Sequence, residues 1–197
     1  MALVAPPFLS SWREQRRLRR SAVSYVSSLL AEPEAEDVAW LAECATRGDA
    51  DRARWELRYA RRAAGLLSAE RDALDDRTAS AVAREIGESW SKDRNIAAGM
   101  RHAAEQQFNA RLRVLGQALN ARSSPEPTGT RLGKALLTAA GSSFPSRQDV
   151  DRAGSVVSRF LEQANEALRK AFGTAYLPEN VPPSAVQSGG SDSPPRR

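Results

Sequence analysis

Cysteine and histidine are almost absent from this sequence, with one of each in 197 residues. Cys44 alone cannot form an intramolecular disulfide, and a thiolate zinc site requires several cysteines at fixed spacing. His102 alone cannot supply the repeated histidine ligands of di-iron bundles or of multi-histidine hydrolase sites. We therefore expect no disulfide framework, no zinc finger and no cofactor held by such ligands.

Long apolar runs are missing as well. No apolar segment approaches the length of about 18 residues that a transmembrane helix requires. Residues 1–12 carry no charged side chain and the arginines follow them, which is the reverse of the order in a secretory signal. The sequence therefore predicts a cytoplasmic protein without a transmembrane segment.

Lysine is scarce, and charge is distributed unevenly. The chain contains three lysines beside 26 arginines, and its net charge is +5. Residues 1–31 carry five arginines against one glutamate, whereas residues 32–93 carry fifteen acidic and ten basic residues. Residues 94–122 are basic again, with five arginines against one glutamate. Because opposed blocks can attract each other within one fold, a basic isoelectric point argues only weakly for a polyanionic partner.

Apolar residues recur at helical spacing along most of the chain, and no strand-like alternation bounded by turns is found. The fold class predicted is all-α, a single-domain bundle of about six to seven helices. We expect a flexible N-terminus over residues 1–10, the bundle over residues 11–173, and a disordered tail rich in Pro, Ser and Gly over residues 174–197.

Capping residues predict where the helices begin and end. Ser11 stands three residues before Glu14, the spacing of a capping box, and predicts a first helix that runs to about Ala31. Further helices are predicted at residues 34–48, at 49–74 with Asp49 or Asp51 as the cap, from Asp76 onwards, at 95–121, around Leu136, and at 146–173 with Ser146 as the cap. The helix at 95–121 has the most persistent apolar stripe, which includes Ile96, Met100, Ala104, Phe108 and Leu115.

The predicted helix at residues 49–74 is apolar on two opposite sides. One stripe contains Leu57, Ala60 and Ala64, and the other contains Trp55, Tyr59 and Leu66 with Arg62 interrupting it. Such a helix must be covered on both sides. Two interpretations follow: a central helix of the bundle, which we favour, or an interface with a second chain formed by Trp55, Tyr59, Arg62 and Leu66.

Five arginines lie within eight residues of the predicted first helix, and they are the main candidate site. They are Arg13, Arg16, Arg17, Arg19 and Arg20. Apolar positions are few in this half of the helix, so it cannot bury a stripe, whereas the half from Ala22 to Leu30 can dock on the body. The arginines either pair with the acidic block or project as ligands for carboxylates or phosphates. Residues 8–30 could also lie on an anionic membrane surface.

Signals for catalysis are weak. Asp72, Asp75 and Asp76 could gather on one helical turn and hold Mg²⁺, but no second aspartate-rich run faces them, and a cap with solvated carboxylates is favoured. His102 is predicted to face solvent, and no motif supplies a nucleophile for it to activate. We identify no catalytic residue and no metal ligand.

The preferred hypothesis is therefore a cytoplasmic protein-protein interaction protein, an adaptor or assembly subunit, whose arginine-rich first helix contacts a protein partner or a second copy. The alternative is a nucleic-acid-binding protein in which Arg13–Arg20 hold phosphates, aided by Arg94, Arg101, Arg111 and Arg113. An all-α Mg²⁺-dependent hydrolase is a third and weaker hypothesis.

Overall fold

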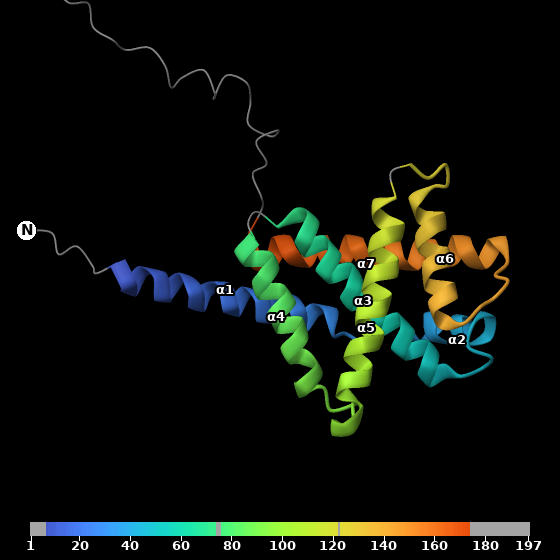
Figure 1. The fold of residues 1–197 in the computed structure, drawn as a ribbon, viewed down its shortest axis with the longest axis horizontal. Helices are drawn as coiled ribbons and strands as arrows, with labels where there is room; N and C mark the ends of the chain where they lie inside the picture. The colour runs from blue at the N-terminus through green and yellow to red at the C-terminus, as the bar shows by residue number, and fades with distance from the viewer. Residues whose placement is uncertain (1–6, 74–75, 122, 174–197) are drawn as a thin grey trace, which may run out of the picture.

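Seven α-helices pack as one bundle in the computed structural model, which describes residues 7–73, 76–121 and 123–173, with side chains from Trp12 onwards (Figure 1). The helices are α1 (Pro7–Leu29), α2 (Ala35–Cys44), α3 (Ala50–Asp72), α4 (Asp76–Lys92), α5 (Arg101–Asn120), α6 (Thr128–Ala140) and α7 (Arg147–Phe172). A short 3-10 turn, η1 (Ala98–Met100), precedes α5. The described residues contain no strand, which confirms the all-α prediction.

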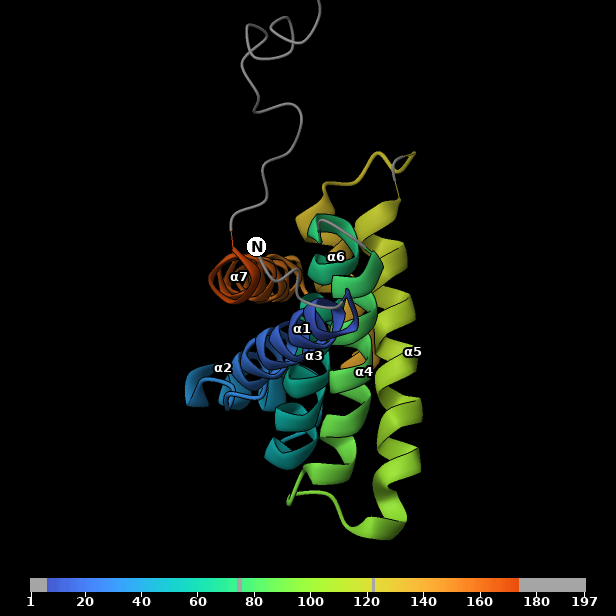
Figure 2. The same cartoon turned by 90° about the vertical axis from the view of Figure 1, so that its left-hand side faces the viewer.

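Helix α3 lies at the centre of the bundle and contacts each of the other six α-helices (Figures 1 and 2). Its residues from Arg62 to Ala69 are all buried, and Leu57 and Ala63 have no exposed surface. Small side chains are frequent in this stretch and let neighbouring backbones approach closely. The central position explains why α3 is apolar on two sides.

Several helix ends follow the predicted caps. The Asp49 carboxylate accepts a hydrogen bond from the Arg52 amide at 2.9 Å, and the Ser146 hydroxyl accepts one from the Asp149 amide at 3.1 Å. Each bond satisfies an amide that has no partner within its own helix. Gly173 ends α7 with a φ of 93°, a left-handed conformation that glycine adopts without steric cost.

The first helix begins four residues earlier than the Ser11 capping box predicts. Helix α1 starts at Pro7, so Ser11 is an interior residue and the capping-box prediction is wrong. Proline suits the first turn of a helix because the amide that it lacks would have no partner there. Residues 7–10 are therefore helical, while residues 1–6 and the predicted tail at 174–197 lie outside the described part of the chain.

The helix predicted from Asn95 begins only at Arg101. The Asp93 carboxylate accepts a hydrogen bond from the Asn95 amide at 3.0 Å, which stabilises a turn in place of a helix start. The chain then enters η1, and Met100 is 60% exposed, so it does not belong to the buried stripe. An aspartate side chain competing for the backbone therefore overrides the apolar periodicity.

Helices α6 and α7 pack closely because two glycines face the partner helix. A Cβ at Gly133 would overlap the Val150 carbonyl oxygen, and a Cβ at Gly154 would overlap the Gly129 carbonyl oxygen. The absence of side chains at these two positions lets the backbones of the two helices touch.

Replacing Gly133 by alanine should therefore lower the free energy of unfolding by about 1–3 kcal/mol, because the obstacle is backbone that cannot rotate away. Urea denaturation monitored by circular dichroism measures this change. Gly87→Ala is the matched control, since Gly87 is an exposed residue of α4 and a Cβ there would meet nothing within 4 Å. This control should gain about 0.5–1 kcal/mol, and an equal response of the two variants would contradict the close-packing explanation.

Candidate functional site

Helix α1 is docked on the bundle through its C-terminal half. Ala22, Tyr25, Val26 and Leu29 are buried there, at the spacing of one helix face. The Tyr25 hydroxyl donates a hydrogen bond to the carbonyl of Gly65 in α3 at 2.8 Å. Burial, and to a lesser extent the charge of nearby Asp72, raises the pKa of Tyr25. This half of α1 is fixed to the bundle by apolar packing and a buried hydrogen bond.

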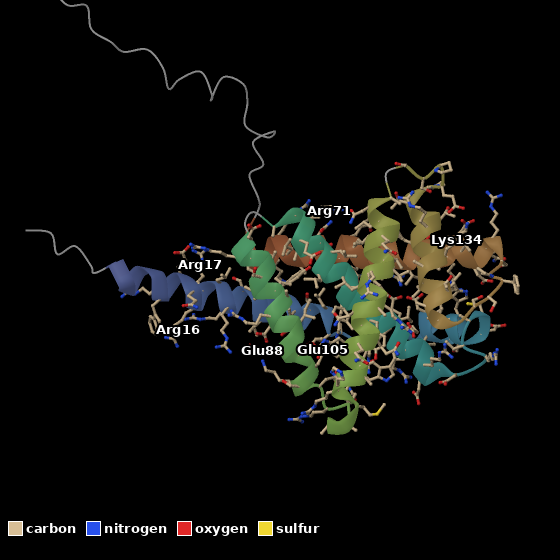
Figure 3. The ribbon with its side chains drawn as sticks, viewed as in Figure 1. Arg16, Arg17, Arg71, Glu88, Glu105 and Lys134 are labelled. Atoms are coloured by element: carbon tan, nitrogen blue, oxygen red, sulfur yellow. The ribbon has the colours of Figure 1, made fainter. Side chains whose placement is uncertain are left out.

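The N-terminal half of α1 extends beyond the other helices (Figure 1). From Trp12 to Arg20 every side chain is exposed except that of Leu18, which is half-buried. Arg16 and Arg17 extend from the part of the helix that lies outside the bundle (Figure 3). Trp12 is 53% exposed, and the Arg16 guanidinium stacks over its ring at 4.5 Å from the ring centre.

The acidic block does not neutralise these arginines. Arg19 lies 3.8 Å from Glu88 of α4, and both side chains are well exposed, so this contact contributes little to stability. Arg13, Arg17 and Arg20 form no ion pair or hydrogen bond with any described residue. Pairing with the acidic block therefore explains the position of Arg19 at most, and not of the other four arginines of the cluster.

Four of the arginines share one side of α1. At about 100° per residue, Arg13, Arg16, Arg17 and Arg20 fall within an arc of about 100°. We call these four residues the arginine face. Arg19 lies outside this arc, on the side turned toward α4, which agrees with its contact to Glu88. The arginine face is therefore directed away from the α4 contact.

The acidic block pairs with later parts of the chain instead. Both Glu56 oxygens accept hydrogen bonds from Arg111 of α5, at 2.6 and 2.9 Å, and these hydrogen bonds to Glu56 raise the pKa of Arg111. Asp37 of α2 pairs with Arg159 of α7, and Glu36 lies 3.1 Å from Arg152 of α7. Carboxylates of the acidic block on α2 and α3 are thus paired with arginines of α5 and α7.

The possible interface on α3 is covered by the chain itself. Tyr59, Arg62 and Leu66 are buried, and Trp55 is half-buried. The Tyr59 ring packs between those of Trp55, at 5.7 Å, and Trp90 of α4, at 5.9 Å. The hypothesis that this face meets a second chain is corrected, because α4 and α5 of the same chain already occupy it.

Arg62 is 4% exposed and is held by a neighbouring carboxylate. Its Nη2 donates to Asp93 at 2.8 Å, and its guanidinium stacks at 4.0 Å over the Trp90 ring. Desolvation lowers the pKa of Arg62, and the hydrogen bond to Asp93 partly opposes this effect. Burial acts to raise the pKa of Asp93, but the hydrogen bonds from Arg62 and from the Asn95 amide outweigh it, so that pKa lies below its ordinary value.

The candidates for catalysis or metal binding are not brought together. Asp72 accepts two hydrogen bonds from Arg71, Asp76 is exposed, and Asp75 lies outside the described residues. Within the described ranges no three His, Cys, Asp or Glu side chains are grouped to hold a metal ion. His102 is exposed and its Nε2 lies 2.9 Å from the Gln106 amide nitrogen.

Cys44 is half-buried, and burial together with the charge of Asp149 raises its pKa to about 11. At neutral pH its thiol is therefore protonated and weakly nucleophilic. None of the helices described is both long and apolar enough to cross a bilayer.

Two side chains that the sequence assigns to the docked half of the first helix are exposed, one in α1 and one directly after its end. Val23 and Leu30 are 41% and 40% exposed and lie beside a cavity that the sequence does not reveal. Val23 lies eleven residues after Trp12, and Leu30 lies seven residues after Val23. At helical spacing all three fall on one line beside the buried stripe, and this spacing is the sequence signal for their exposure.

No family model, curated protein or solved structure matches this chain. The chemistry of the exposed arginines and of the cavity is therefore the basis for a functional conclusion.

The Arg62–Asp93 pair makes a prediction about pH. At neutral pH, Asp93→Asn should lower the free energy of unfolding by about 3–5 kcal/mol, because it leaves a buried guanidinium uncompensated. Since the pKa of Asp93 is lowered in the folded protein, the pair contributes fully above about pH 4 and is lost as the pH falls through that lowered value. The difference between wild type and variant should consequently shrink below pH 4.

Urea denaturation at pH 7 and at pH 3 measures this difference. Asp151→Asn is the control, since Asp151 is exposed and its contact with Arg147 is at 4.0 Å. The control should change stability by less than about 0.5 kcal/mol at either pH. If Asp93→Asn lowered the free energy of unfolding as little as Asp151→Asn, the buried pair would not contribute to stability.

Proposed function

We propose that this chain is an interaction protein, an adaptor or assembly subunit, that binds an acidic protein surface through the arginine face of α1. One observation carries the proposal: Arg13, Arg17 and Arg20 stand exposed on a projecting helix without an anionic partner among the described residues. Arginine and tryptophan are the usual anchors of protein interfaces, and Trp12 is exposed beside the arginine face.

The arginine face does not stabilise the isolated chain, which favours an intermolecular role. Arg13 and Arg17 are four residues apart, as are Arg16 and Arg20, and like charges at this spacing destabilise a helix by a few tenths of a kcal/mol per pair. Carboxylates of a partner would turn this repulsion into charge-assisted hydrogen bonds.

A protein partner is favoured over nucleic acid because the basic side chains do not form one continuous surface. Arg111, which the nucleic-acid hypothesis requires, is engaged by Glu56. Arg101 and Arg113 belong to α5, which is separated from α1 by α4 (Figure 2). A duplex lying along α1 would therefore meet only the arginine face and a few neighbours. The proposed compartment is the cytoplasm.

The test compares two variants with the same change in charge. The first replaces Arg13, Arg17 and Arg20 by glutamine, and the control replaces Arg101, Arg113 and Arg147, which are exposed arginines of α5 and α7. Fluorescence anisotropy with a labelled 15-residue polyglutamate peptide at low salt provides the measurement. The first variant should bind about tenfold or more weakly than wild type, whereas the control should stay within about twofold.

Two results would overturn the proposal. One is an equal loss of binding in both variants, which would reflect net charge alone. The other is a preference of more than about tenfold for a DNA duplex over polyglutamate, which would favour the nucleic-acid alternative. A mass measurement on the wild type identifies a second copy as the partner if a dimer is found and the first variant is monomeric.

A further inference from the structure

A cavity of about 440 Å³ lies between the C-terminal half of α1, α3, α4 and the turn after α4. This volume is within the range of small-molecule sites in proteins. Val23 and Val26 of α1, with Leu30 directly after its end, form the apolar wall of the cavity. Val26 is buried, while the other two side chains are exposed at the edge of the cavity, so they offer apolar surface to an occupant.

The opposite wall is charged, and most of its charges are paired. Arg58 pairs with Glu32, Arg62 pairs with Asp93 at 2.8 Å, and Lys92 pairs with Glu85 at 3.2 Å. Each of these ion pairs joins two residues of the lining, so the three pairs are neutral together.

One further cation breaks this balance. Arg94 also belongs to the lining, is exposed, and has no ion pair or hydrogen bond with any described residue. Lys92 also lies 3.1 Å from Glu88, which does not belong to the lining, so Arg94 is the one charged residue of the lining without an ion pair to a described residue. An occupant with a single negative charge would neutralise it.

The guanidinium of Arg62, another residue of the lining, has one N–H group without a hydrogen-bond acceptor among the described residues. Its Nη2 is bonded to Asp93, but its Nη1 is buried and has no acceptor in the structure. A buried donor without an acceptor is unfavourable, because it has lost its hydrogen bonds to water. The guanidinium attracts an anion in the cavity through its charge, and a shift of the side chain would bring Nη1 into direct contact.

We propose that this cavity binds a small organic acid, a single carboxylate attached to an apolar body. The carboxylate would lie against Arg94 above the Arg62 guanidinium, and the body would lie along Val23, Val26 and Leu30. A dianion is disfavoured because three carboxylates already belong to the lining, and a cation is disfavoured by the unpaired charge of Arg94. This site is separate from the arginine face and does not rest on the proposed function.

Octanoate is the probe, at concentrations below those at which it forms micelles. Isothermal titration calorimetry on the full chain should detect binding of octanoate, with octanamide of the same length at least about tenfold weaker because it lacks the charge. Octylammonium should not bind. Methyl resonances of Val23, Val26 and Leu30 should shift during the titration.

Two exposed positions test the site without disturbing the buried pair. Arg94→Gln should weaken octanoate binding about tenfold, and Val23→Glu should abolish it by adding a negative charge to the apolar wall. Arg101→Gln is the matched control, because Arg101 is also exposed, at the start of α5, but does not belong to the lining. Its affinity should equal that of wild type.

The proposal is overturned if octanoate and octanamide bind equally, or if Arg94→Gln and Arg101→Gln bind octanoate alike. It is also overturned if the shifted methyl resonances belong to another part of the surface, such as exposed Val114. None of these outcomes bears on the arginine face, which the polyglutamate measurement tests separately.

Discussion

The enclosure of α3 is the constraint on which the rest of the bundle depends. A helix with apolar residues on two opposite sides exposes one of them to water unless neighbours cover both. The Tyr59 side of α3 meets Trp90 of α4, and the carbonyl of Gly65 accepts a hydrogen bond from Tyr25 of α1. All six other helices contact α3, so their positions follow from covering it.

The same enclosure decides which charges are used internally. Glu56 and Arg62 are buried on α3, and each requires a partner of opposite charge. Arg111 of α5 pairs with Glu56, and Asp93, in the turn after α4, pairs with Arg62. The pairs between α2 and α7 are internal in the same way, whereas Arg13, Arg17 and Arg20 of α1 have no anionic partner among the described residues.

Helix α1 combines two kinds of surface because only half of it is needed to cover the core. Its C-terminal half contributes Tyr25 and Leu29 to the core and borders the cavity with Val23 and Leu30. Its N-terminal half has no stripe to bury and presents the arginine face. The two surfaces differ in chemistry: one presents exposed guanidinium groups outside the bundle, and the other combines an apolar wall with one unpaired cation.

The sequence by itself determined the helical class, the need to cover α3 on two sides, the caps at Asp49 and Ser146, and the inability of the α1 arginines to join a core. These properties depend on residues within a few turns of one another. Only the tertiary structure decided that Asp93 binds Arg62, that Arg111 is taken by Glu56, and that a cavity opens beside Val23. Those choices depend on which distant side chains meet, and helical periodicity carries no information about partners 31 or 55 residues away.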